Sequence, residues 1–160
     1  MRRTYVAMAI LAGVMLAGAG GIRADNVQDN ERGRRRQCSV ATLRGDYGIQ
    51  IQGTRPSGPG GPIESVVGVV IRTYDGNGSF EQIDNVHGSI SGTVPDRPGF
   101  GTYVVNANCT GVAYLQLLPG PPFAIEERLV IVDNGLELSS ATMNPPPVMV
   151  TGVHHKIHHN

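Results

Sequence analysis

The sequence has no tryptophan, two cysteines, and aromatic residues at only 5% of its length. Its apolar run Val6 to Leu16 is well short of the ~20 residues that a membrane-spanning helix needs. Neither sign of charge dominates, since the sequence contains 13 basic and 13 acidic residues. These features argue against an integral membrane segment and against the concentrated basic surface that nucleic acid requires.

Familiar reaction motifs are also missing from the sequence. There is no Cys-x-x-Cys pair, no glycine loop that would cradle a phosphate, and no serine, histidine and aspartate pattern of a hydrolase. No cofactor is therefore expected. The residues that are present favour a binding or structural protein over an enzyme.

The first 24 residues have the composition of an export signal. Two arginines near the start precede the apolar run, and small residues follow it up to Ala24. Ala24 is the expected last residue before cleavage, and Ala19 is the alternative. We therefore expect an exported protein that works in the periplasm or outside the cell.

A polar leader, residues 25–37, is expected to separate the signal from the folded part. Val27 is its only aliphatic residue, so it buries too little apolar surface to offset the entropy of ordering. A single domain is expected over residues 38–153, followed by a histidine-rich tail, residues 154–160. Without the arginines of the signal, the remaining chain is mildly acidic.

The two cysteines, Cys38 and Cys109, are most simply interpreted as one disulfide in an exported protein. On the chain-entropy model, closing a loop of this length contributes about 4 kcal/mol to the free energy of unfolding. Two free buried thiols are the alternative. Neither cysteine lies in a redox motif.

From Cys38 onward, short β-rich runs alternate with glycine, proline and Asx-Gly turns. Eight strands are expected near residues 46–54, 63–74, 79–86, 101–106, 111–118, 124–132, 136–143 and 148–155. The runs 75–78 and 133–135 predict tight hairpins, and 56–62, 92–99 and 145–147 predict longer connections that contain proline. Eight antiparallel strands in one small domain predict an all-β up-and-down barrel, with a two-sheet β-sandwich as the alternative.

Alternation along the strands suggests which residues face inward. The first strand has Tyr47, Ile49 and Ile51 on one face and polar residues on the other. The second strand is apolar on both faces, so an outward surface containing Val66 and Val70 is expected to be covered, for example by another copy of the protein.

One carboxylate, Glu127, is the sharpest catalytic candidate. It shares a face of its strand with Ile125, Leu129 and Ile131, so inward orientation would place it in an apolar interior and allow it to transfer protons. The alternative is that Glu127 lies at a rim or pairs with an arginine. The candidate residues for a ligand cavity are Tyr47, Ile49, Ile51, Tyr103 and Glu127.

Four histidines near the C-terminus form a weak candidate metal site: His154, His155, His158 and His159. A helical tail would bring them together in pairs at a spacing of four residues. No cysteine or carboxylate accompanies them, so metal binding is the third functional hypothesis.

Three phrases carry a resemblance: Cys-Ser-x-Ala-Thr-Leu-x-Gly-x-Tyr-Gly from Cys38, Asp-Gly-x-Gly from Asp75, and Gly-Thr-Tyr-x-Val from Gly101 leading to Cys-Thr-Gly at Cys109. Their combination resembles a group of small exported bacterial proteins of unknown function. The resemblance implies a barrel similar to those of allene oxide cyclase and dirigent proteins, and more loosely to calycins. It transfers no catalytic residue.

The residues thus favour an exported, non-catalytic barrel that binds a small apolar molecule or associates with itself. The competing hypothesis is a cyclase or isomerase that uses Glu127.

Overall fold

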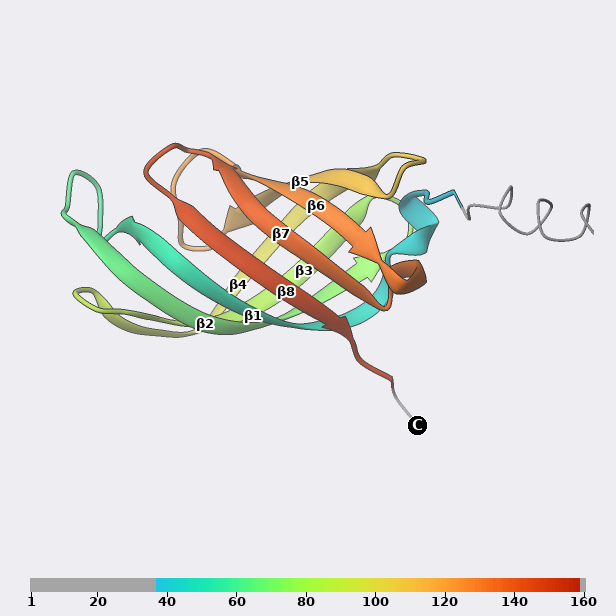
Figure 1. Cartoon of the computed structure of the whole chain (residues 1–160). Helices are drawn as coiled ribbons and strands as arrows, with labels where there is room; N and C mark the ends of the chain where they lie inside the picture. The colour runs from blue at the N-terminus through green and yellow to red at the C-terminus, as the bar shows by residue number, and fades with distance from the viewer. Residues whose placement is uncertain (1–36, 159–160) are drawn as a thin grey trace, which may run out of the picture. The chain divides into compact units, whose positions relative to one another are not determined.

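The computed structural model describes residues 37–158, so the predicted signal, nearly all of the predicted leader and His159 lie outside the described residues. Eight strands follow one another along the chain (Figure 1): β1 (Arg44–Pro56), β2 (Ile63–Asp75), β3 (Ser79–Gly88), β4 (Gly92–Val105), β5 (Thr110–Leu117), β6 (Ile125–Val132), β7 (Glu137–Asn144) and β8 (Met149–Lys156). Two single 3-10 turns, η1 (Val40–Thr42) and η2 (Asp133–Gly135), complete the description. No helix within residues 37–158 is long and apolar enough to cross a membrane.

The strands form a closed antiparallel barrel in which each strand pairs with its neighbours in the chain. β1 also pairs with β8, from Tyr47 opposite Lys156 to Thr54 opposite Met149, and this pairing closes the sheet. The predicted up-and-down barrel is confirmed, and the sandwich alternative is wrong. Because β8 ends at Lys156, the barrel extends beyond residue 153, where the sequence analysis had ended it.

The β2–β3 hairpin shows why the sequence turns where it does. Gly76 and Gly78 adopt φ values of 79° and 107°, a region that costs glycine little. The Asp75 carboxylate accepts hydrogen bonds from the N–H groups of Asn77 and Ser79 at 2.7 and 2.9 Å. These bonds, that of Ser79 first, lower the pKa of Asp75.

The segment 92–99, predicted as an exposed connection, is instead the first half of β4. It pairs with β3, whereas the pairing of β4 with β5 begins only at Gly99. The first half of β4 therefore has a ladder partner on one side. Such an edge tolerates Pro95 and Pro98, which is why the two prolines misled the sequence prediction.

One end of the barrel, which we call the closed end, is filled by aromatic side chains. Tyr74 contacts Tyr47 and Tyr103 edge to face, with ring centroids 5.3 and 5.0 Å apart, and it contacts Phe80 at 5.6 Å. All four rings are buried. Burial, together with the two neighbouring tyrosines, raises the pKa of Tyr47 to about 12. We call Leu43 and these four rings the aromatic plug.

The N-terminal segment of the described chain is fastened to the closed end. The Cys38–Cys109 disulfide, which confirms the predicted pairing, joins it to the residue that precedes β5. The Tyr103 hydroxyl donates toward the carbonyl oxygens of Val40 and Leu43, at 3.0 and 2.9 Å. These contacts hold Leu43, which is fully buried, in the plug.

The change Tyr103→Phe tests this fastening. It leaves the two carbonyl oxygens without their donor, so we expect the free energy of unfolding to fall by about 1 to 3 kcal/mol. Tyr114→Phe is the matched control, because the Tyr114 ring lies on the outer surface and its change should stay within ~0.5 kcal/mol. Equal effects of the two changes in urea denaturation would contradict this role of Tyr103.

Candidate functional site

A cavity of about 80 Å³ lies inside the barrel, and we call it the lumen. It extends from the aromatic plug toward the opposite end of the barrel, which we call the mouth, where the β1–β2, β3–β4, β5–β6 and β7–β8 connections lie (Figure 1). Its walls combine polar and charged side chains with aliphatic ones, and the aliphatic ones include Ile49, Ile51, Val66, Val70, Leu115 and Leu117. The alternation of β-strands brings these residues inward from β1, β2 and β5.

An ion pair crosses the lumen between two strands that are not neighbours in the sheet. The Arg72 guanidinium, on β2, donates to both carboxylate oxygens of Glu127, on β6, at 2.8 and 3.3 Å. The Arg72 side chain is 3% exposed and that of Glu127 is 13% exposed. A bidentate pair of this kind is strong and directional, and it fixes both side chains in place.

Other groups around Arg72 use most of its remaining hydrogen-bonding capacity. Its Nε donates to Gln82 at 2.8 Å, and it lies 3.3 Å from the Tyr74 hydroxyl. The guanidinium carbon also lies 4.3 Å from the centroid of the Phe80 ring. Burial disfavours the charged form, but Glu127 and Tyr74 outweigh it and raise the pKa of Arg72. Arg72 is therefore a fixed cation on the floor of the lumen.

His154, on β8, is another polar residue of the lumen. It is 1% exposed, and its Nε2 lies 2.9 Å from the Ser140 hydroxyl. Within the described chain, its Nδ1 has no hydrogen-bond partner although it is buried. Buried polar atoms of this kind are normally satisfied, by protein groups or by water. His154 is one of the residues that line the lumen, so its unsatisfied nitrogen makes this residue a candidate for ligand binding.

Glycine makes room for this histidine. A Cβ atom at Gly152 would lie 2.8 Å from the Ser140 hydroxyl oxygen and 3.3 Å from His154 Nε2. Burial, followed by the charge of Arg72 and then His155, lowers the pKa of His154 well below 6.5. His154 is thus a neutral hydrogen-bonding group at physiological pH.

Two more ion pairs lie nearer the mouth. Arg97 donates to both carboxylate oxygens of Asp84, at 3.0 and 2.9 Å. Arg55 donates to Glu64 at 3.0 Å, and Glu64 also accepts bonds from the N–H groups of Ile90 and Ser91 and from the Ser91 hydroxyl. The bonds from Ser91 are the main reason that the pKa of Glu64 falls to about 2. Glu64 is therefore held ionised by its partners.

The predicted cavity residues separate into two groups. Ile49, Ile51 and Glu127 line the lumen. Tyr47 and Tyr103 lie in the aromatic plug, where their hydroxyl groups donate to backbone carbonyl oxygens. The structure also shows Glu127 paired with an arginine, which was the alternative that the sequence left open.

The outward surface expected at Val66 and Val70 has to be corrected. Both side chains are buried, at 3% and 5% exposure, and they face the lumen. Directly opposed residues of two strands share a face, and Val70 lies opposite the inward Ile49. The apolar residues of β2 that do face outward are Ile63, Val67, Val69 and Ile71.

The first two of the four histidines are separated by the barrel wall, and His159 lies outside the described residues. His154 and His155 are consecutive residues of β8, so they point to opposite sides of the barrel wall. His155 is exposed and lies 3.4 Å from the Glu137 carboxylate. Among residues 37–158, no group of three or more potential ligands is arranged to hold a metal ion.

Arg72, Gln82 and Ser140 were not predicted as site residues, and His154 was assigned to a tail. For Arg72 a signal was available in the sequence. Arg72 continues the alternating series of Val66, Val70 and Tyr74, whose members share one face. A charged residue on the inward face of a strand is rare unless it is paired. The position of Arg72 in the alternation therefore predicts an oppositely charged partner in the interior.

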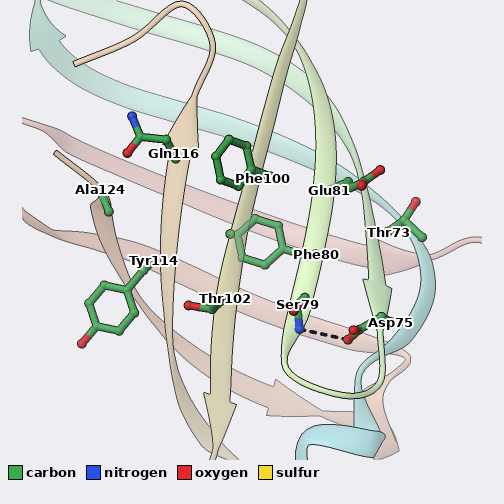
Figure 2. A pocket seen from close by; sticks show the side chains of 11 residues that line it. Thr73, Asp75, Ser79, Phe80, Glu81, Phe100, Thr102, Tyr114, Gln116 and Ala124 are labelled. Atoms are coloured by element: carbon green, nitrogen blue, oxygen red, sulfur yellow. Dashed lines mark hydrogen bonds between the residues drawn. The ribbon is translucent and has the colours of Figure 1, made fainter. Parts of the chain in front are cut away.

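The outer wall also carries a shallow groove across β2 to β5. Figure 2 shows Phe100 and Tyr114 along it, together with Glu81, Thr73 and Asp75. Phe100 and Tyr114 are each about half exposed. The polar side chains in this groove lie in contact with solvent. The lumen is the better candidate site, because it combines apolar walls with an unsatisfied buried polar atom.

Comparison with protein-family models, with curated proteins and with solved structures finds no match to this chain.

Titration of His154 gives a prediction for the pH dependence of stability. The unfolded chain takes up a proton on this histidine near pH 6.5, whereas the folded chain does so only at much lower pH. The unfolded state therefore binds more protons below pH 6.5, and the free energy of unfolding falls as the pH drops from about 6.5 to 5. One such group contributes at most ~1.4 kcal/mol per pH unit.

We expect His154→Leu to flatten this slope in urea denaturation between pH 7 and 5. His155→Leu, on the outer side of the same strand, should retain the wild-type slope. The depressed carboxylates Glu64 and Asp75 titrate at lower pH and do not affect this window. Equal slopes for wild type and His154→Leu would show that His154 is not buried in its neutral form.

Proposed function

We propose that this protein is an exported binding protein that holds a small molecule in the lumen of its barrel. The observation that carries the proposal is that His154, a residue of the lumen wall, has a buried Nδ1 atom without a hydrogen-bond partner in the described chain. Pockets for small molecules combine apolar walls with placed polar groups, and the lumen offers both kinds of side chain.

The form of the barrel supports this proposal. The aromatic plug and the N-terminal segment fill one end, so a ligand enters from the mouth. The three ion pairs keep the inward charged groups occupied with one another. The site is therefore preformed, and ordering its side chains on ligand binding costs little conformational entropy.

The cavity volume limits what the lumen takes up. About 80 Å³ is roughly half of the ~150 Å³ apolar cavity that admits benzene. The lumen thus accommodates one small group of a ligand, and the rest of a larger molecule would extend to the mouth. The part of a ligand that fits is therefore smaller than expected for a barrel whose interior holds only valine, isoleucine and leucine side chains.

Export is part of the proposal. Residues 1–24 have the order of charge, apolar core and small residues that an export signal has. The disulfide between Cys38 and Cys109 is typical of proteins that fold outside the cytoplasm. We propose the periplasm or the extracellular space as the place of action.

Native mass spectrometry of the protein purified from the compartment to which it is exported tests the binding function. We expect a retained small molecule in wild type and its loss in Leu117→Trp, because the indole ring would occupy the lumen. Gln116→Trp is the matched control, since Gln116 faces the outer groove and the ligand should be retained. Wild-type protein without a ligand, or equal retention in both variants, would contradict the proposal.

A cyclase or isomerase that uses Glu127 is the second candidate function. The observation in its favour is that Glu127 lies in the lumen wall near the site proposed for the ligand. Against it, both carboxylate oxygens accept hydrogen bonds from Arg72, which favours a positioning role.

The change Glu127→Gln separates the two functions. The ligand found in the native protein is incubated with wild type and with the variant. We expect its chromatographic retention and its mass to stay unchanged in both cases. Formation of an isomer by wild type but not by Glu127→Gln would establish the enzyme instead. Far-ultraviolet circular dichroism checks that the variant is folded, because removal of one charge from a buried pair costs about 3 to 5 kcal/mol.

A further inference from the structure

We propose that the lumen selects an uncharged group that forms hydrogen bonds, such as a hydroxyl or carbonyl, which bonds to Nδ1 of His154. The inference rests on the binding function proposed above and specifies its ligand. Four features of the lumen support it: balanced charges, one free ring nitrogen, a restricted volume and a glycine that positions the histidine.

The charges of the lumen are already balanced. Three arginines, Arg55, Arg72 and Arg97, each pair with one carboxylate at 2.8 to 3.0 Å. An additional ligand charge would lose its hydration on entering the cavity and would find no unpaired counter-charge there. Burying a charge without a partner is unfavourable, which disfavours carboxylates and amines with the charged group inside.

An uncharged polar group avoids this cost and satisfies the free atom of His154. The ring is neutral, so its Nδ1 is either a donor or an acceptor, depending on which nitrogen carries the proton. Ser140 contacts the other ring nitrogen and thereby orients the ring. A hydroxyl group can bond to either form of the ring, and a carbonyl to the form that carries the proton on Nδ1.

The packing around His154 fixes the ring on its Nε2 side. Gly152 leaves room for the bond between Nε2 and Ser140, because a Cβ at this position would press on both of these atoms. The aliphatic side chains of Ile51 and Leu117 line the same cavity. A ligand with a polar end and a short hydrocarbon chain therefore fits, with the polar end at His154 and the chain toward the mouth.

Three compounds with the same four-carbon chain test the head group: 1-butanol, butyrate and butylammonium. The protein is labelled with 15N at histidine and with 13C at methyl groups, and each compound is titrated at pH 7.5 while NMR spectra are recorded. We expect 1-butanol to shift the Nδ1 resonance of His154 and the methyl resonances of Ile51 and Leu117. Butyrate and butylammonium should bind at least tenfold more weakly at this position.

Variants separate the role of His154 from general effects on the fold. His154→Leu should weaken 1-butanol binding by about fivefold to tenfold, the equivalent of one hydrogen bond. His155→Leu changes the neighbouring outward residue and should leave the binding unchanged. If His154→Leu does not fold, the response of Nδ1 in wild type decides the question alone.

The outcomes distinguish this inference from the broader binding function. Lumen methyl shifts without a response at Nδ1, or preferential binding of either ion, would overturn the selection for an uncharged group and leave lumen binding intact. A water molecule that stays bound to Nδ1 when 1-butanol is added would also overturn it. If no compound shifts the lumen methyl resonances and wild type retains no ligand from its own compartment, the binding function itself fails.

Discussion

The pairing of β1 with β8 is the constraint on which the rest of the structure depends. It turns a sheet with two faces into a wall with an inside and an outside, and it removes both sheet edges. Arg72 and Glu127 come from strands that are not neighbours, so they meet only because the sheet curves until its ends join. His154 lies on the closing strand itself, opposite Ile49, and its burial has the same origin.

The two ends of the barrel have different roles. The three phrases singled out in the sequence all lie at the closed end: the segment from Cys38 to Gly48, the turn that starts at Asp75, and the residues from Gly101 to Gly111. They form the disulfide, the tight hairpin and the aromatic plug, which are features of stability. The groups that we assign to ligand binding lie between this plug and the mouth, outside those phrases. Such phrases therefore favour a fold and say little about a ligand.

Much of the fold could be predicted from local patterns, because turn residues and alternation act over a few positions. The hairpin at Asp75 and the inward series of β1 follow from such patterns. The first half of β4 could not, since Pro95 is tolerated only because one edge of that segment lacks a ladder partner. The direction of Val66 also depends on pairing, as β2 is apolar on both faces. The lumen was hardest to predict, because the partner of Arg72 is 55 residues away in the sequence.

The most direct test of the account is whether β1 and β8 are paired in solution. Amide hydrogen exchange of both strands, followed by NMR at neutral pH, measures this pairing strand by strand. The account predicts slow exchange for the amides of β1 that bond toward β2 and equally slow exchange for those that bond toward β8, from Tyr47 to Thr54. Fast exchange confined to the side of β1 that faces β8 would show an open sheet, and the lumen with its ion pair would not exist as described.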